Sequence, residues 1–218
     1  MEKYQQNTRT TVQQVILMGY TADVGRKIVR LARRSIMDYL EMGRLTYPSD
    51  EDVPSEKMGV FVSLYTYPES DLRGCIGYPY PIMSLKEAVA KAAVAAATQD
   101  PRFNPVEVGE MDRIVVEVSV LTRPEEVKCD KRTDLPRNIR VGVDGLIIET
   151  PYGSGLLLPQ VPVEYGWDSE TYLTHLCLKA GLEPTYWLHG RMRLLRYTAQ
   201  IFRETSPGGD VVEVSLGA

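Results

Sequence analysis

The sequence predicts an α+β fold with mostly antiparallel sheets and helices packed against one face of them. Residues 21–42 repeat apolar side chains at helical spacing, and two pairs of strand-like segments are each joined by a turn containing Pro and Ser. Each half of the chain also runs strand, strand, helix, strand, with turns too short for a parallel crossover between the first two strands. We therefore expect one domain over residues 1–218, built from two interleaved lobes that share a cleft.

The elements of the first half follow from local signals. The helix over residues 21–42 ends at Gly43, and the stretch 44–58, which holds two prolines and a run of acids, is typical of a loop. The segments VFVSLYTY and LRGCIG form a predicted hairpin around the turn PESD. Ser84 and Glu87 make a capping box before an alanine-rich helix, which favours close packing on a sheet. The apolar run RIVVEVSVL closes this half as a strand.

The second half repeats this order. The segments GLIIET and GLLLPQV are predicted strands around the turn PYGS, and Asp168 or Ser169 caps the helix that follows. The run RLLRYTAQIF is predicted as one further strand. Because the capping residues Ser84 and Asp168 stand at matching places, we expect a duplication with repeats at approximately 60–122 and 144–203.

The stretch LRGCIG places a charge and a thiol in a predicted strand. Side chains alternate along a strand, so the stretch has an apolar face and a second face. The apolar face holds Leu72, Gly74 and Ile76, and the second face holds Arg73, Cys75 and Gly77. A guanidinium beside a thiol favours the thiolate, which suits a nucleophilic or redox cysteine. A free cysteine is also a small apolar side chain, so simple packing is the alternative.

Three further side chains are candidates for the same site. Glu117 interrupts an apolar strand, either as a general base or partner of Arg73 or Arg102, or as a structural ion pair or solvated face. Arg102, in the segment DPRFNP, either binds a carboxylate or phosphate or caps the preceding helix. His175 completes a Cys–His pair if the cleft brings it to Cys75, although a lone histidine is more often a surface or core residue.

Charge and motifs argue against several classes of function. The net charge of −4 gives no general attraction to nucleic acid, and no apolar run approaches the length of a membrane span. Three well-separated cysteines are typical of a reducing compartment, so we expect a cytoplasmic protein. The metal motifs C-x-x-C, H-x-x-x-H and H-E-x-x-H and the phosphate-loop motif do not occur in the sequence. We therefore expect no metal site and no cofactor.

The ordered set of motifs resembles the AMMECR1 domain family. LRGCIG is followed by DPRFNPV, VEVSVL, LLLPQV and GWDSETYLTHLCLKAGL, from about Arg26 to about Arg203. The resemblance implies a stand-alone α+β domain with a duplicated unit, signature residues around a cleft, and no established biochemical activity. In microbes it also implies an association with a Memo-type protein and a radical-SAM protein. The matching signature residues are Arg73 to Gly77, Pro101, Arg102, Phe103, Pro105, Leu158 to Val161, Trp167, Cys177, Lys179 and Gly181.

The leading hypothesis for function is an enzyme that uses a thiolate in the cleft. Cys75 is then the nucleophile, Arg73 its electrostatic activator, and Glu117 or His175 the proton carrier. The substrate is expected to be a small anionic metabolite or a modified macromolecule. Five residues are the expected substrate contacts: Gly74, Gly77, Arg102, Asn104 and Gln160. The alternatives are a non-catalytic protein-binding or adaptor domain and an RNA-binding protein.

Overall fold

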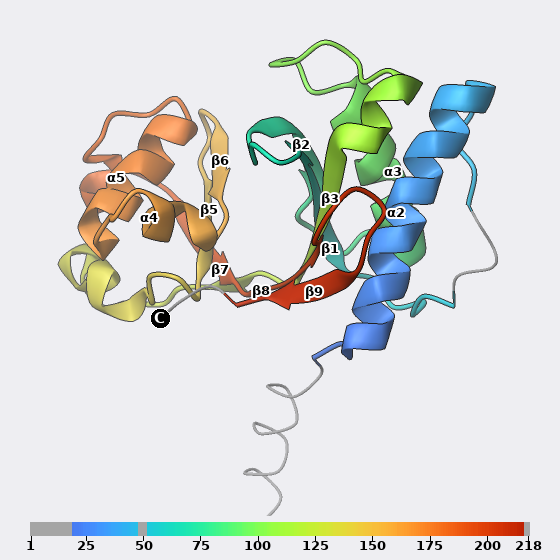
Figure 1. Cartoon of the computed structure of the whole chain (residues 1–218). Coiled ribbons are helices and arrows are strands. Elements are labelled where there is room, and N and C mark those ends of the chain that lie inside the picture. Colours follow the sequence, from blue (N-terminus) through green and yellow to red (C-terminus); the bar gives the residue numbers. More distant parts are fainter. Residues whose placement is uncertain (1–18, 48–51, 216–218) are drawn as a thin grey trace, which may run out of the picture.

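The computed structural model describes residues 19–47 and 52–215 and shows the α+β fold that the sequence predicts. The molecule has two lobes, each built from an antiparallel sheet with helices packed against it (Figure 1). The described chain begins in the first lobe, builds the second lobe over residues 125–197, and then returns to the first lobe.

The first lobe contains two long helices and one sheet. Its elements are α2 (Ala22–Met42), β1 (Gly59–Thr66), β2 (Leu72–Tyr78), α3 (Leu85–Thr98), the 3-10 helix η1 (Val108–Arg113), β3 (Ile114–Leu121), β8 (Ala199–Glu204) and β9 (Val211–Val214). The strand order is β2-β1-β3-β8-β9. The side chain of Thr21 caps α2, which ends at Gly43 with a left-handed φ of 68°. Ser84 caps α3, as the sequence predicts.

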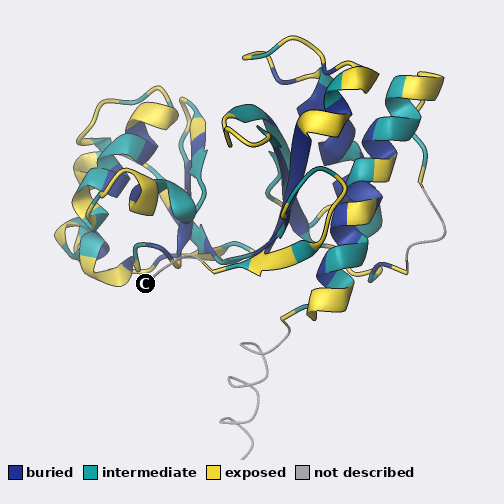
Figure 2. Cartoon of the chain, in the orientation of Figure 1, coloured by how far each residue is buried: buried dark blue, intermediate teal, exposed yellow. Residues whose placement is uncertain are grey.

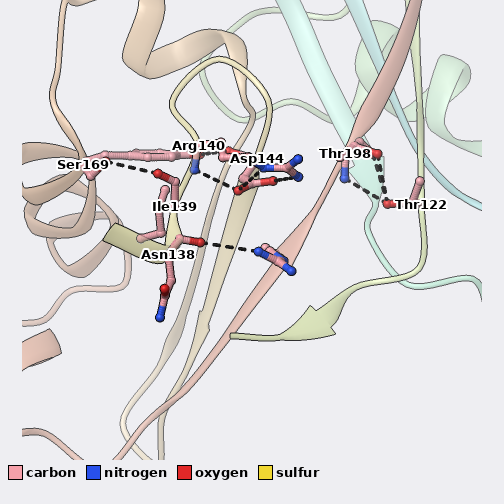
Figure 3. Close-up of polar contacts among 9 residues, drawn as sticks. Thr122, Asn138, Ile139, Arg140, Asp144, Ser169 and Thr198 are labelled. Atoms are coloured by element: carbon pink, nitrogen blue, oxygen red, sulfur yellow. Dashed lines mark hydrogen bonds and ion pairs between the residues drawn. The ribbon is translucent and has the colours of Figure 1, made fainter. Parts of the chain in front are cut away.

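The second lobe contains the other sheet and shorter helices. Its elements are β4 (Glu125–Glu126), the 3-10 helix η2 (Arg132–Asn138), β5 (Gly145–Glu149), β6 (Ser154–Leu157), α4 (Gln160–Glu164), α5 (Ser169–Lys179), α6 (Tyr186–His189) and β7 (Arg193–Tyr197). The strand order is β4-β7-β5-β6. Asp168 caps α5 by accepting from the Thr171 backbone N–H. The loop before β5 is closed by an ion pair between Arg140 and the fully buried Asp144, 2.7 Å apart (Figure 3).

The last strand predicted from the sequence is two strands that belong to different sheets. β7 pairs with β5 in the second lobe, whereas β8 pairs with β3 in the first lobe, and Thr198 lies between them. The Thr198 backbone N–H donates to Oγ1 of Thr122 over 2.9 Å at this crossing (Figure 3). The expectation of one strand over residues 193–202 is therefore wrong, because an apolar run does not show where a strand changes sheet. The edge strand β9 has no counterpart in the sequence-based prediction.

Alternation along β1 and β3 gives the first sheet two different faces. One face packs against α2 and α3 in the main hydrophobic core, with Val60, Val62, Leu64, Val116, Val118 and Val120 as its strand residues. Figure 2 shows buried residues in these strands and on the inward sides of the helices, whereas the outward sides are exposed. The opposite face is directed at the second lobe, because Phe61 packs there with Leu121, Ile147, Leu195 and Tyr197.

The two lobes have matching strand orders. β1 lies between β2 and β3, and β5 lies between β6 and β7. α3 packs against β1 and β2, and α5 packs against β5 and β6. This agreement supports a proposal that residues 60–122 and 144–203 are duplicated units. The duplication and the single domain over residues 1–218 stay predictions.

Candidate functional site

Four side chains form one row across the face of the first sheet that is directed at the second lobe. The strand register pairs Ser63 with Cys75, Ser63 with Glu117, and Glu117 with Arg203. Side chains of residues paired across neighbouring strands lie on the same face. Cys75, Ser63, Glu117 and Arg203, called the polar row below, therefore cross β2, β1, β3 and β8 beside the apolar contact that joins the lobes.

Cys75 is the member of the polar row on the edge strand β2. Ser63 Oγ donates a hydrogen bond to its Sγ over 3.3 Å, and the Cys75 backbone N–H donates to Asp100 Oδ2 over 2.8 Å. Burial raises the pKa of the Cys75 thiol and outweighs the hydrogen bond from Ser63 and the charge of Arg102, which lower it. This direction is the opposite of the acidified thiol that the sequence predicts, so the resting thiol is neutral at physiological pH.

Arg73 has a different partner from the one expected. Its Nε and Nη2 donate to the two carboxylate oxygens of Glu110 over 3.0 and 3.1 Å, and its Nη1 donates to the Asn104 carbonyl over 2.9 Å. The guanidinium carbon also lies 6.0 Å from the centroid of the Phe103 ring. A bidentate ion pair of this kind is strong and directional. Arg73 therefore anchors β2 to η1, and the Asn104 backbone carbonyl accepts a further hydrogen bond from the same guanidinium.

Arg102 is also held by a carboxylate. Its Nε donates to Asp100 Oδ1 over 3.0 Å, and its Nη2 donates to Oδ2 over 2.7 Å. These hydrogen bonds lower the pKa of Asp100 to about 2. The Asp100 side chain is 3% exposed, whereas that of Arg102 is 52% exposed. Asp100 thus ties the end of α3 to Cys75, and Arg102 neutralises the carboxylate that makes this connection.

Glu117 is the buried acid of the polar row. The residue is 5% exposed, and its ion-pair partner Arg203 lies 4.0 Å away. Burial raises the pKa of Glu117 to about 7; the Arg203 charge opposes the shift, and the charge of Glu164 on α4 adds to it. The partner is therefore Arg203, so of the alternatives that the sequence left open, the pair with Arg73 or Arg102 is not formed and an ion pair within the sheet is. A carboxyl group with this pKa can take up and release a proton at neutral pH.

Gln160 is a half-buried residue of the second lobe. It is the first residue of α4, and Glu164 follows one turn later, so the two side chains lie on the same side of this helix. The Gln160 Oε1 atom is buried and has no hydrogen-bond partner among the described residues. Leaving such an atom unpaired costs free energy, so a donor from a bound molecule would stabilise it.

Comparison with known proteins identifies the family. The AMMECR1 family model matches residues 29–202 of the chain. The chain belongs to the AMMECR1 family. Protein MJ0810 of Methanocaldococcus jannaschii is 53% identical over 196 residues, which cover 90% of this chain and 98% of that protein. Protein PH0010 of Pyrococcus horikoshii is 52% identical over 192 residues, which cover 86% of this chain and 93% of that protein.

A crystal structure of a relative shows the same fold. The structure of the uncharacterized protein PH0010 from Pyrococcus horikoshii matches this chain with a TM-score of 0.84 at 50% sequence identity. The match covers 88% of this chain and 97% of that one. The names of these AMMECR1 relatives state no activity, so the comparisons show the family and the fold but not a reaction.

Two glycines of the AMMECR1 chain make room for neighbouring groups. A Cβ atom at Gly74 would lie 2.2 Å from the Ala96 carbonyl oxygen in α3, and one at Gly77 would lie 2.4 Å from the Phe61 ring. Gly74 therefore faces α3 and lets this helix approach the sheet, as the predicted alternation requires. The Phe61 ring packs against Gly77. Gly74 is buried against α3, and substrate contact at the half-buried Gly77 stays a prediction.

His175 packs within the second lobe. Its ring stacks on Trp167, with centroids 3.8 Å apart and an angle of 5° between the planes. Its helix α5 packs against β5 and β6, and in Figure 1 the second sheet lies between α5 and β2. The expected Cys–His pair between His175 and Cys75 is therefore not formed.

Sequence reasoning missed six residues at this site, namely Ser63, Tyr65, Asp100, Glu110, Glu164 and Arg203. Alternation in VFVSLYTY puts Ser63 and Tyr65 on the same side of the strand as Phe61, so the sequence pattern alone could have identified these two residues. Arg203, whose guanidinium carbon lies 4.4 Å from the centroid of the Tyr65 ring, depends on the register between β3 and β8. Glu164 depends on where α4 lies relative to the first sheet, and no local pattern encodes that position.

Residues 19–47 and 52–215 contain neither a metal-binding cluster nor a membrane-spanning helix. In these residues no group of three or more His, Cys, Asp or Glu side chains is arranged to hold a metal ion. None of the helices found there has both the length and the apolar character that crossing a bilayer requires.

Proposed function

We propose that this AMMECR1 protein binds a small molecule in a cleft between its lobes and acts on it by proton transfer and thiol chemistry at the polar row. Glu117 acts as the general base and acid, Cys75 is the reacting thiol, and Ser63 lies between them. The observation that carries this proposal is the buried Glu117 carboxyl group, whose pKa is about 7 and whose cationic partner is 4.0 Å away. A buried carboxyl group is costly for packing alone, and groups with such pKa values concentrate at functional sites.

The proposed chemistry follows from the states of Cys75 and Glu117. Burial keeps the Cys75 thiol neutral at rest, so a base has to remove its proton before the sulfur becomes nucleophilic. In the proposed step this proton passes to the Glu117 carboxylate, while the Ser63 hydroxyl stays hydrogen-bonded to the sulfur. The step leaves a thiolate and a neutral carboxyl group. It replaces the preformed thiolate beside Arg73 that the sequence predicts.

The pH dependence of Cys75 alkylation tests this proposal. Cys177 is buried, so Cys129→Ser leaves Cys75 as the accessible thiol. In that background we expect the iodoacetamide labelling rate to show an inflection near pH 7, where Glu117 ionises. In Glu117→Gln the inflection disappears, and the rate follows only the ionisation of the thiol. Exposed Glu125→Gln is the control and keeps the inflection. A profile that Glu117→Gln leaves unchanged contradicts the proposed proton transfer.

A non-catalytic adaptor is the second candidate function, and one observation favours it. The charges of the two signature arginines are already paired within the chain, Arg73 with Glu110 and Arg102 with Asp100. Such pairs make the β1–β2 hairpin a rigid structural element. A partner protein would then dock on another surface of the molecule. The adaptor predicts slow labelling of Cys75 with no inflection near neutral pH in any variant. The net charge of −4 gives RNA binding, the third candidate, no general electrostatic support.

We further propose that the protein acts in the cytoplasm, in a pathway with a Memo-type and a radical-SAM protein. The support for the compartment is that all three cysteines lie in the described residues and are free. The support for the partners is the family resemblance alone. Affinity capture of the tagged chain from its source cells tests this proposal, and finding neither protein type in the captured material contradicts it.

A further inference from the structure

Two side chains from the segment after α3 pair with the outer edge of β2. We propose that Asp100 and Arg102 are positioning residues for Cys75, which together take the place of a neighbouring strand and set the reactivity of the thiol. This inference rests on the proposed function, since Cys75 is the reacting thiol there. It gives Arg102 the role of electrostatic activator that the sequence predicts for Arg73.

The backbone of Cys75 is held on its outward side. β2 is the first strand in the order of its sheet, so the backbone groups that point away from β1 have no strand to pair with. The Cys75 N–H donates to Asp100 Oδ2 over 2.8 Å, and the Cys75 carbonyl accepts from Arg102 Nη2 at the longer distance of 3.5 Å. An acceptor and a donor in these places reproduce the contacts of a paired strand. They fix the backbone that holds the sulfur 3.3 Å from Ser63 Oγ.

The Asp100 carboxylate is committed to this arrangement through both of its oxygens. Oδ1 accepts from the Arg102 backbone N–H over 3.1 Å and from Arg102 Nε over 3.0 Å. Oδ2 accepts from Arg102 Nη2 over 2.7 Å and from the Cys75 N–H. Water satisfies the outward groups of an edge strand without burying a charge, so closing the edge does not by itself explain a buried carboxylate. The arrangement holds one residue of β2, and that residue carries the thiol.

The two charges act on the thiol in opposite directions. Arg102 lowers the pKa of the Cys75 thiol, whereas Asp100 raises it. Loss of either partner breaks the same set of hydrogen bonds, so both losses should destabilise the protein. Their effects on the reactivity of the thiol should nevertheless be opposite, because one loss leaves a cation beside Cys75 and the other leaves an anion. The ionisable groups that interact with the thiol come from four parts of the chain: Arg102 and Asp100 after α3, Glu117 on β3, Tyr65 on β1 and Tyr197 on β7.

Alkylation of Cys75 in charge variants tests this inference. The full chain with Cys129→Ser is labelled with iodoacetamide at about pH 9, above the pKa of Glu117 of about 7. We expect Arg102→Gln to slow labelling roughly threefold and Asp100→Asn to accelerate it roughly threefold, because the thiolate fraction changes more than the nucleophilicity of the thiolate. Urea unfolding should show a loss of stability in both variants. Arg102→Lys keeps the charge and should label faster than Arg102→Gln.

An exposed ion pair provides matched controls. Arg113 and Glu69 lie 3.8 Å apart, and both side chains are exposed. Arg113→Gln and Glu69→Gln remove the same charges as the two test variants without touching the backbone of Cys75. Both should leave the labelling rate of Cys75 unchanged.

The direction of the two rate changes decides the outcome. A purely structural pair would change the rate in the same direction in Arg102→Gln and Asp100→Asn, and that result, or no change in either, overturns the inference. If Asp100→Asn does not fold, equal rates in Arg102→Gln and Arg102→Lys overturn it. The proposed function fails separately, when Glu117→Gln keeps the inflection near pH 7. Opposite rate changes with that inflection kept remove only the proton transfer, and rate changes in one direction with the inflection lost remove only the role of the pair.

Discussion

At the scale of single residues, Glu117 shows how one strand position sets the acidity of a carboxyl group. Alternation predicts its face correctly, because Val116 and Val118 on either side enter the main core. Its partner is not predictable in the same way. Arg203 is 86 positions away in the chain, and it reaches Glu117 only through the pairing of β3 with β8. Local patterns thus give the face of a residue but not its cross-strand neighbour.

The raised pKa of Glu117 predicts how stability depends on pH. The folded state holds this proton up to about pH 7, whereas the unfolded chain releases it near pH 4.5. Ionisation therefore favours the unfolded state, and the free energy of unfolding falls as pH rises between these values, by about 3 kcal/mol in total. We expect Glu117→Gln to remove this slope, so the variant gains about 3 kcal/mol relative to wild type between about pH 4 and about pH 8. Urea unfolding across this range measures the difference.

Glu125→Gln is the control for this measurement, because the Glu125 side chain is exposed in the folded protein, whereas that of Glu117 is buried. It should keep the wild-type slope. A constant offset between Glu117→Gln and wild type at every pH would contradict the prediction, because it would mean that the carboxyl group titrates alike in the folded and unfolded states.

At the scale of elements, the first half of the chain is predicted better than the second. The helix that ends at Gly43, the hairpin, the Ser84 cap and the strand over residues 114–121 all follow from local signals that the structure confirms. The run over residues 193–202 does not, because strand propensity is continuous across Thr198 while the chain passes between sheets. The sheet to which a strand belongs is set by long-range pairing, and not by its own residues.

The contact of α3 with β2 gives an element-scale prediction at Gly74. The added Cβ of Gly74→Ala would lie 2.2 Å from the Ala96 carbonyl oxygen, which is backbone and cannot rotate away. The helix has to move off the sheet, and overpacking of this kind costs roughly 1–3 kcal/mol. Urea unfolding should show this loss. Gly109→Ala, where no atom lies within 4 Å of the added carbon, is the control and should change stability little. Equal stability of Gly74→Ala and wild type would mean that α3 does not pack as closely as described.

At the scale of the whole molecule, three features connect the two lobes. Phe61 and Leu121 of the first lobe pack with Ile147, Leu195 and Tyr197 of the second. The continuous chain from β7 to β8 runs through both sheets, and the Tyr80 hydroxyl donates to Glu149 at the end of β5. The apolar contact between the lobes depends on how the two sheets face each other, which no segment of the sequence records by itself.

This joint core predicts cooperative unfolding that two probes can report separately. Both tryptophans, Trp167 and Trp187, lie in the second lobe. Most of the helical residues in the described part of the chain lie in the first lobe, because α2 and α3 have 21 and 14 residues. We expect urea transitions followed by tryptophan fluorescence and by far-UV circular dichroism to coincide. Leu121→Ala removes a fully buried side chain from the first-lobe side of the joint core and should cost roughly 2–5 kcal/mol.

The decisive result is which of the two unfolding transitions shows the loss of stability in Leu121→Ala. Leu121 belongs to β3, so in a molecule with independent lobes its truncation would shift the circular dichroism transition and leave the tryptophan transition in place. In a cooperative molecule both transitions move to lower urea by the same amount, because the second lobe unfolds with the first. Val212→Ala, at an exposed position of β9, is the control and should move neither transition appreciably. Coincident shifts would mean that the two lobes unfold as one unit, so a site built from residues of both lobes would be lost in a single transition.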